Sequence, residues 1–293
     1  MAVSKLRILY IVILIAIIAV MIVTIVSDPS DRTLLIKCAS LIILYIAAII
    51  KLEGRRNSLA GKHYAVQYKD ILKDAFTDNR SAEKQLMKGI VLYNEGKYDA
   101  AVSKFDSLKK ACVRTADHVA VLTFRALCFS ERQDYDEAVA TYRELLDRAP
   151  DNSRAWSNMG LCYSKSGHTD LAADAFKNAI RADDKNAYAH TNYASLLLDM
   201  IWEDEEESAS NSNEALKHAR AALQINATLL PALSMACQAS ARLGDEKGAQ
   251  EYLKQFGRAG GDWKTLKETM DMETAFTREL AMEDDMEEDD EDQ

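Results

Sequence analysis

A 34-residue repeat of small and aromatic residues runs through the middle of this 293-residue chain. In two consecutive stretches, side chains of the same kind recur at the same places, in the pairs Phe129 and Tyr163, Ala138 and Ala172, Tyr142 and Phe176, and Leu145 and Ala179. A fixed period of this length is typical of stacked supersecondary units, none of which can bury its apolar face without its neighbours. Because the chain has only 3 Pro and 11 Gly, the repeats are predicted to be helical.

The pattern resembles the tetratricopeptide-repeat (TPR) family, whose helix pairs carry small residues at positions 8, 20 and 27, aromatic residues at 11 and 24, and Pro at 32. The copy at residues 153–186 has Trp156, Gly160, Tyr163, Ala172, Phe176 and Ala179 in the expected places, with Asp184 instead of Pro. The copy at 119–152 has Ala126, Ala138, Tyr142, Leu145 and Pro150. An earlier copy, 82–115, has Gly89, Ala101 and Phe105. The resemblance implies that these residues are structural.

Two further copies are less regular. In the copy at 187–229 the second helix comes nine residues late, and the acidic and polar run at 203–213 is predicted to be a solvated loop. The copy at 230–261 is degraded, as terminal copies are. Residues 262–280 are predicted to form a capping helix. The resemblance therefore implies an all-α solenoid of about five helix pairs over residues 82–261.

The resemblance also implies where a ligand binds. In TPR proteins, residues of the first helix of each pair line a concave groove, and an Asn at position 6 often hydrogen-bonds the backbone of an extended peptide. Asn158 and Asn192 occupy this position in consecutive copies. The other groove candidates are Arg154, Ser157, Lys165, Tyr188, Thr191 and Phe124. The alternative is that these are solvated residues without a partner.

Two apolar runs near the N-terminus are predicted to cross a membrane. Residues 8–26 carry no charge and, at about 1.5 Å per residue, nearly span a hydrocarbon core of about 30 Å. Residues 34–50 form a shorter run with Lys37 near its start, for which a buried or re-entrant helix is the alternative. Together they predict a transmembrane hairpin within residues 1–56. A cleaved signal peptide is the competing interpretation, disfavoured because no A-x-A-like site follows the first run.

The flanks of the hairpin predict its orientation. Lys and Arg gather before the first run and after the second, so we expect an integral membrane protein whose repeats face the cytoplasm. Residues 57–81 are predicted to be a helical linker, which packs on the first repeat or lies on the lipid surface.

The acidity of the chain is concentrated at its C-terminus. Of 46 Asp and Glu, against 36 Lys and Arg, nine lie in residues 283–292, so the rest of the chain is close to neutral. A near-neutral body argues against nucleic acid as a partner, because phosphate attraction needs a basic face. Residues 281–293 are predicted to be a disordered tail that keeps the protein soluble, recruits a basic protein, or folds back over Arg154 and Lys165.

No motif in the chain indicates a reaction. Phosphate-binding glycine loops, zinc-protease motifs and nucleophile elbows are all missing from the sequence, and the 5 His are far apart. The 5 Cys lack zinc-ligand spacing and are predicted to pack in the core of a protein in a reducing compartment. We therefore expect no enzyme, no cofactor and no metal.

The combined features predict a membrane-anchored TPR adaptor that holds cytoplasmic proteins or peptides at the bilayer through its groove. The alternative is an assembly or quality-control factor for a membrane complex, with the hairpin contacting other spans.

Overall fold

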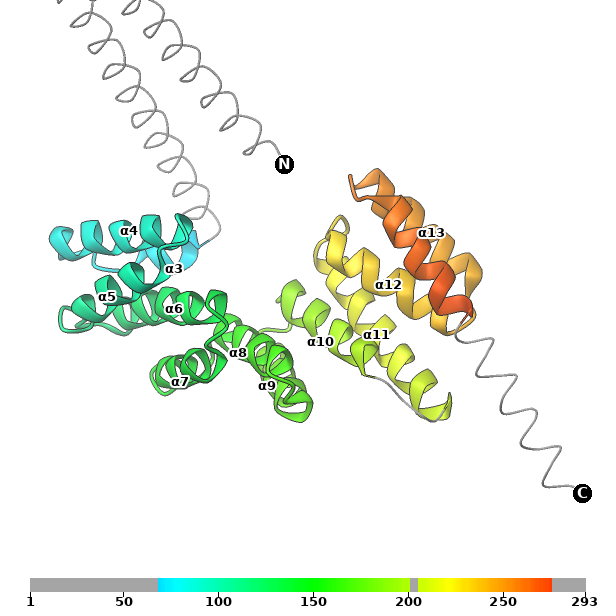
Figure 1. Ribbon diagram of the computed structural model, residues 1–293, viewed down its shortest axis with the longest axis horizontal. Helices are drawn as coiled ribbons and strands as arrows, with labels where there is room; N and C mark the ends of the chain where they lie inside the picture. The colour runs from blue at the N-terminus through cyan, green and yellow to red at the C-terminus, as the bar shows by residue number, and fades with distance from the viewer. Residues whose placement is uncertain (1–67, 201–204, 276–293) are drawn as a thin grey trace, which may run out of the picture. The chain divides into compact units, whose positions relative to one another are not determined.

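The computed structural model describes residues 68–200 and 205–275 (Figure 1). The chain divides into two compact units, Met1–Lys69 and Asp70–Gln293, and nearly all described residues belong to the second. The helices are α3 (Lys69–Lys73), α4 (Arg80–Asn94), α5 (Tyr98–Lys109), α6 (Thr115–Glu131), α7 (Tyr135–Leu146), α8 (Ser153–Lys165), α9 (Thr169–Ala182), α10 (Ala187–Asp199), α11 (Glu205–Ile225), α12 (Leu230–Arg242) and α13 (Glu246–Arg258). A further helix covers residues 263–275.

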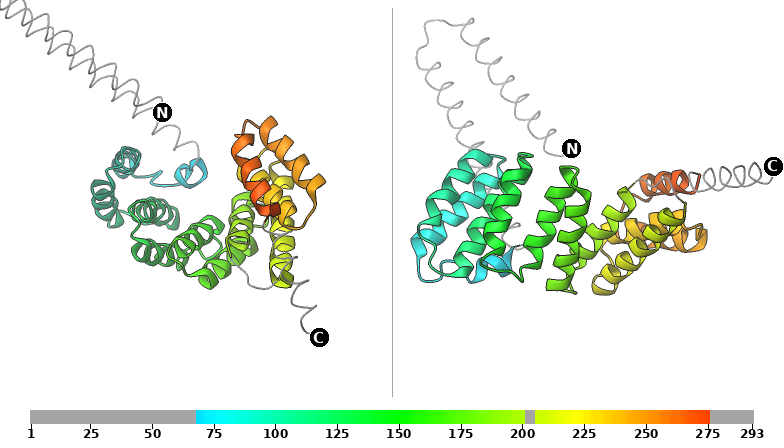
Figure 2. Two further views of the ribbon diagram at one scale, coloured as in Figure 1. Left: turned by 45° about the vertical axis from the view of Figure 1, so that its right-hand side comes forward. Right: turned by 90° about the horizontal axis from the view of Figure 1, so that it is seen from below.

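Each repeat copy consists of one pair of helices. The pairs are α4 and α5, α6 and α7, α8 and α9, α10 and α11, and α12 and α13, and every helix also contacts the next one along the chain (Figures 1 and 2). The first helices of several neighbouring pairs contact one another directly, as α8 does with α10 and α10 with α12. The described part of the second unit is therefore an all-α solenoid, as the 34-residue period predicts.

The signature residues of the repeats lie inside the stack. Gly89 and Gly160 each have an aromatic ring packed directly against their Cα, from Phe105 and Phe176 respectively. The other small and aromatic residues of the pattern are nearly or completely buried, namely Ala101, Ala126, Ala138, Tyr142, Tyr163, Ala172 and Ala179. Trp156 is half-buried, and its indole N–H donates to the carbonyl of Pro150 at 2.8 Å. Small residues thus let neighbouring helices approach, while the rings fill the space between them.

Asparagine begins three of the first helices. Asn79, Asn152 and Asn186 each accept, through the side-chain oxygen, a hydrogen bond from the backbone N–H three residues later. These N-caps satisfy donors that the first turn of a helix leaves unpaired. Asn186 also donates to Ser153 Oγ at 2.8 Å, which joins copy four to copy three.

In four of the helix pairs, the turn between the two helices uses a left-handed residue at the same repeat position. Gly96, Gly167 and Gly244 have φ of 72°, 81° and 70°, and in copy two Gln133 has φ of 67°. Glycine adopts this conformation without the steric cost that a Cβ brings. Copy two therefore keeps the turn geometry with a less suitable residue.

The predicted loop in copy four is largely helix. α11 begins at Glu205, so most of the acidic and polar run at 203–213 extends the second helix of that pair. Acidic residues are favourable at a helix N-terminus, and Ser212 in the run is buried. Asn211 and Asn213 also donate to carbonyls one turn earlier. The prediction of a solvated loop there is wrong because a polar composition alone does not distinguish a loop from an exposed helix.

The two ends of the described repeats are closed by local contacts. Before α4, Phe76 is buried, and its backbone N–H donates to the Asp117 carboxylate at 2.7 Å. After α13, the helix at 263–275 buries Leu266 against the last pair, and Glu273 pairs with Arg242. This helix lies within the predicted cap at 262–280. Of the predicted linker at 57–81, the structure describes residues 68–81, in which α3 is a single short helix.

In residues 68–200 and 205–275, no helix is both long and apolar enough to cross a membrane. The predicted fold, a membrane hairpin followed by repeats, is therefore corrected to an all-α solenoid. The integral membrane location with cytoplasmic repeats is not supported and is withdrawn. Even α11, which has 21 residues, carries Glu, Lys and Arg. The two apolar runs, residues 8–26 and 34–50, lie outside the described residues.

The acidic tail at 281–293 also lies outside the described residues. Its predicted disorder and its predicted basic partner are untested by the structure, and no finding supports either a tail partner or a lipid partner.

Candidate functional site

The predicted groove residues fall into two groups, accessible and buried. Asn158, Asn192 and Arg154 are half-buried, while Lys165 and Tyr188 are exposed. We call the surface of α8 and α10 that carries these five residues the first-helix face. Tyr188 is 63% exposed, which is unusual for a large ring. Asn158, Asn192, Lys165 and Tyr188 are therefore at least partly accessible from solvent.

The other three predicted groove residues are buried. Phe124 is fully enclosed, with its ring stacked on Phe105 at 6.1 Å between centroids. Ser157 accepts a hydrogen bond from Asn192 Nδ2 at 3.1 Å, and Thr191 donates to the carbonyl of Ala187 at 2.7 Å. In the structure, Phe124, Ser157 and Thr191 pack within the stack instead of facing a ligand.

The two asparagines differ in how many of their groups are occupied. Asn158 has no hydrogen-bond partner among the described residues, so its amide has both a donor and an acceptor to offer. Asn192 uses one N–H on Ser157 and keeps its carbonyl oxygen. A side-chain amide can pair with a peptide group at both its donor and its acceptor. The first-helix face therefore presents two partly open amides beside the exposed Tyr188.

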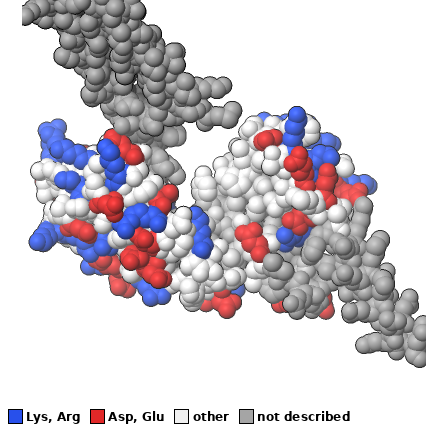
Figure 3. Space-filling model, in the orientation of Figure 1, with Lys and Arg blue, Asp and Glu red and all other residues white. Residues whose placement is uncertain are grey.

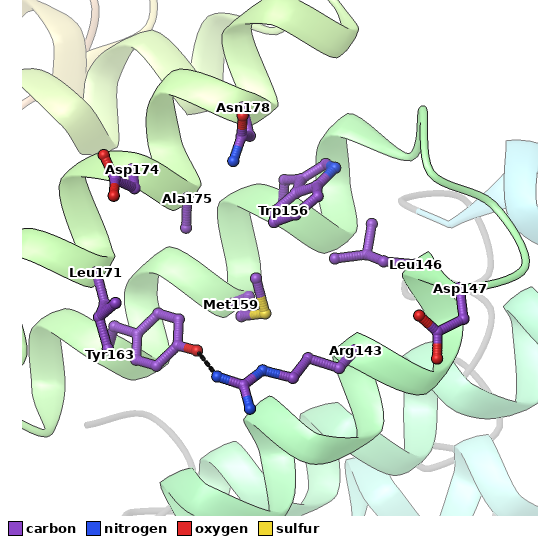
Figure 4. A pocket seen from close by; sticks show the side chains of 10 residues that line it. All are labelled: Arg143, Leu146, Asp147, Trp156, Met159, Tyr163, Leu171, Asp174, Ala175 and Asn178. Atoms are coloured by element: carbon purple, nitrogen blue, oxygen red, sulfur yellow. Dashed lines mark hydrogen bonds between the residues drawn. The ribbon is translucent and has the colours of Figure 1, made fainter.

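A cleft of about 490 Å³ lies elsewhere on the same repeats, between α7 and α9 and over α8 (Figure 4). Its floor is mainly apolar, and charged and polar side chains surround it. The lining residues are Arg143, Leu146, Asp147, Trp156, Met159, Tyr163, Leu171, Asp174, Ala175 and Asn178. Its volume is within the range of about 300–1,000 Å³ that is usual for ligand pockets.

The cleft and the first-helix face use opposite sides of α8. Trp156, Met159 and Tyr163 are spaced three and four residues apart and line one side of the helix. Asn158 follows Trp156 by two residues, which is about 200° around a helix with 3.6 residues per turn. A ligand on one side therefore does not occupy the other.

Sequence reasoning missed this cleft. Its charged and polar residues recur at helical spacing on two second helices, with Arg143 in α7 and Asp147 directly after it, and Asp174 and Asn178 on α9. The sequence shows this spacing, but it does not show that α7 and α9 meet over α8.

Burial disfavours the thiolate form of the described cysteines. Burial raises the pKa of Cys128 to about 12 and those of Cys112 and Cys237 to about 11, and it also raises the pKa of Cys162. A thiol that stays protonated at neutral pH is a poor nucleophile and a poor metal ligand. Within the described ranges, no group of three or more His, Cys, Asp and Glu side chains is placed to hold a metal ion.

Two histidines from different helices meet between α10 and α11. The Nδ1 atoms of His190 and His218 are 2.9 Å apart, and His190 Nε2 lies 3.1 Å from the carbonyl oxygen of Asp184. Because a carbonyl only accepts, Nε2 of His190 carries a proton, and neutral His190 then accepts from His218 at Nδ1. Burial, and then the electrostatic interaction with the neighbouring His190 ring, lower the pKa of His218.

Charges of both signs are interspersed over the repeats on the face drawn in Figure 3. Neither sign dominates that face. Electrostatic selectivity on these repeats therefore depends on local groups such as those around the cleft.

Two family models match the chain, both described as tetratricopeptide repeat, over residues 86–153 and 129–196. Photosystem I assembly protein Ycf3 of Synechococcus sp. (strain CC9605) is 25% identical over 145 residues, covering 44% of this chain and 84% of the relative. Ycf3 of Prochlorococcus marinus (strain NATL2A) is 24% identical over 142 residues, covering 43% and 82%.

Solved structures with a similar course of the chain include MamA, with a TM-score of 0.48 and 16% identity over 59% of this chain and 94% of that one. YrrB, described as a TPR protein with an unusual peptide-binding site, has a TM-score of 0.46 and 16% identity over 67% of this chain and 96% of that one.

Proposed function

Because residues 86–196 match two tetratricopeptide-repeat family models, we propose that the chain is a scaffold that binds an extended segment of a partner protein on its first-helix face. TPR repeats are protein-interaction units, and the stack provides a rigid surface for such a partner. The observation that carries the proposal is the pair of partly open amides, Asn158 and Asn192, next to the exposed Tyr188.

The chemistry of this face favours an extended peptide. Amide side chains at the same position of consecutive copies hydrogen-bond successive backbone groups of a partner and so need no particular partner side chain. Tyr188 offers a large, rigid contact area at low entropic cost. Arg154 and Lys165 add positive charge, so a neutral or acidic segment is preferred over a basic one.

The proposal is tested by site-specific photocrosslinking of the full chain in its native host. A photoreactive amino acid is placed at Tyr188 and, as a control, at Ala140, an exposed position on the second helix α7. Partner bands are expected from position 188 and not from 140, and Asn158→Ala with Asn192→Ala should remove them. Equal bands from both positions, or bands that the double variant leaves unchanged, would contradict the proposal.

A second candidate function is assembly of a multiprotein complex. The observation that favours it is the similarity to Photosystem I assembly protein Ycf3 across most of that relative. An assembly factor contacts subunits before the complex forms, whereas a scaffold stays with its partners. Pulse-chase labelling of the crosslinked bands separates the two, because bands of an assembly factor decay as the complex matures.

A further inference from the structure

The cleft between α7 and α9 differs from the first-helix face in chemistry as well as in position. Met159, Leu146 and Ala175 form a floor that is nearly closed to solvent, and Leu171 at one side is 44% exposed. An exposed leucine beside an apolar floor leaves apolar surface that a partner can cover.

The Trp156 ring stands in this cleft in a defined orientation. Its N–H is bound to the carbonyl of Pro150 at 2.8 Å, which leaves the faces of the indole for other contacts. Figure 4 shows the ring between the α7 and α9 walls. An indole face attracts cations more strongly than any other side-chain ring does.

Two acidic residues lie at the two sides of the floor. Asp147 on α7 and Asp174 on α9 lie on opposite sides of Trp156 and Met159 (Figure 4). Both residues are exposed, and in the described part of the chain neither carboxylate has a hydrogen-bond or ion-pair partner. Asp174 interacts electrostatically with Lys177 on the same helix.

The single basic residue of the cleft is already engaged. Arg143 donates to the Tyr163 hydroxyl at 2.6 Å, so its guanidinium group points toward Tyr163 (Figure 4). The lining therefore has two acids and one base, and the two acids are open to an incoming cation.

We propose that this cleft is a second docking site, which takes a segment of a partner protein carrying a large apolar side chain next to Lys or Arg. The apolar side chain covers the floor and Leu171, and the cation reaches Asp147 or Asp174 and the face of Trp156. Charge complementarity selects this occupant. The acidic segment of the chain itself, residues 283–292, has the wrong sign to compete for the site.

With this second site, the two surfaces of the scaffold bind partner segments of different charge. The first-helix face carries Arg154 and Lys165 and prefers a neutral or acidic segment, while the cleft prefers a basic one. Because they occupy opposite sides of α8, both partners can be held together.

The test uses the full chain and two sets of synthetic twelve-residue peptides. In the first set one Leu or Phe is flanked by two Arg, and in the second the Arg are replaced by Glu. Fluorescence polarisation is expected to detect binding of the Arg set and not of the Glu set. Equal binding of the two sets, or binding of neither, overturns the proposal.

Variants then locate the binding. Asp147→Asn with Asp174→Asn should lower the affinity for the Arg peptides roughly fivefold to tenfold, as expected for the loss of exposed ion pairs. Leu171→Ser should lower that affinity severalfold. All three positions are exposed, so the fold is expected to survive, which far-UV circular dichroism checks.

Two matched controls complete the design. Asp136→Asn with Asp184→Asn removes two exposed carboxylates outside the cleft lining and should leave the affinity unchanged. Asn158→Ala with Asn192→Ala, on the first-helix face, should also leave it unchanged. If either control weakens binding as much as the cleft variants do, the peptides bind elsewhere and the proposal fails.

Discussion

The ring of Phe176 occupies the space that a side chain on Gly160 would need, because a Cβ added there would lie 2.7 Å from Cε1 of the ring. In the first copy, Gly89 and Phe105 have the same relationship at 2.4 Å. Copy two has Ala126 and Tyr142 at the corresponding positions. These three copies therefore all place a small residue of the first helix opposite an aromatic ring of the second, but the two residue types differ between copies.

Gly160→Ala should destabilise the fold. Overpacking costs roughly 1–3 kcal/mol, and the better helix propensity of Ala recovers about 1 kcal/mol, so we expect a net loss in the free energy of unfolding of up to about 2 kcal/mol. Gly257→Ala is the control, since its nearest neighbour, Cβ of Trp263, would be at an ordinary 3.4 Å. Urea unfolding should show a lower free energy of unfolding for Gly160→Ala and no decrease for Gly257→Ala. A gain in both would mean that the Phe176 ring moves aside freely.

Asn186→Ala should cost more than Asn152→Ala. Both remove an N-cap, worth about 1 kcal/mol, but Asn186 also loses its bond to Ser153 of the preceding copy, worth about another 1 kcal/mol. Thermal unfolding of the two variants measures the difference. An equal loss of stability in the two variants would show that the hydrogen bond between Asn186 and Ser153 contributes nothing.

Gln133→Gly should stabilise the protein. Gln133 holds a left-handed φ of 67° at the position where three other copies have Gly. Releasing that strain gains about 1–2 kcal/mol, reduced by the greater entropy that Gly has in the unfolded chain. We expect a net gain of roughly 0.5–1 kcal/mol in chemical unfolding. Gln133→Ala keeps a Cβ and serves as the control, which should show no comparable gain.

Asp117→Asn should destabilise the start of the repeats at neutral pH and much less in acid. Burial raises the pKa of Asp117, but backbone N–H groups of Phe76, Arg114 and Val113 and the Arg114 guanidinium outweigh it, so the pKa lies below its ordinary value of 3.8. The stabilisation is complete above about pH 5 and is lost as the pH falls through the folded-state pKa. Hydrogen bonds to a charged group suggest a loss of about 1.5–3 kcal/mol at pH 7.

Unfolding free energies of the wild type and Asp117→Asn, measured from pH 7 down to pH 3, check this prediction. The two curves should converge below about pH 4. Parallel curves over the whole range would mean that the carboxylate charge is not responsible.

The pairing of His190 and His218 should make α10 and α11 sensitive to mild acid. The pKa of His218 is below its ordinary 6.5 because of burial and His190, so the unfolded chain binds a proton more readily than the folded one. The stabilisation is complete above about pH 6.5 and is lost as the pH falls toward the folded-state pKa. Protonating both rings would also break the bond between their Nδ1 atoms.

His218→Asn tests the histidine pair, because the Asn amide can still donate to His190 while it cannot be protonated. We expect a loss of about 1 kcal/mol or less at pH 7.5 and a flatter stability profile between pH 5 and 7. His168→Asn, at an exposed turn, is the control. An unchanged slope in His218→Asn would assign the pH dependence to other groups.

The solenoid could be predicted from the sequence because its determinants are local. Small and aromatic residues 34 positions apart specify how each helix meets the next, and the structure buries Ala172 and Phe176 accordingly. The helical extension at 205–213 could not be predicted, because Glu, Ser and Asn suit an exposed helix and a loop almost equally. The membrane hairpin rested on hydropathy alone, and the described helices do not support it.

The candidate site was predictable only in part. Asn158 and Asn192 lie at accessible positions, as their repeat register implies, but the register alone did not reveal that Phe124 turns into the core against Phe105. The cleft depends on how α7, α8 and α9 meet. Its acids are unremarkable in sequence, and only packing brings Asp147 and Asp174 to the two sides of Trp156.

The buried cluster that runs from Leu122 in α6 to Ala239 in α12 determines how the repeats yield under tension. Since each copy contacts chiefly its neighbours, a pull on the two ends peels the outermost element before any internal copy. At the C-terminal side that element is the helix at 263–275, held by Leu266 and by the pair of Glu273 with Arg242. We expect this small contact to set the force at which that end of the described stack begins to open.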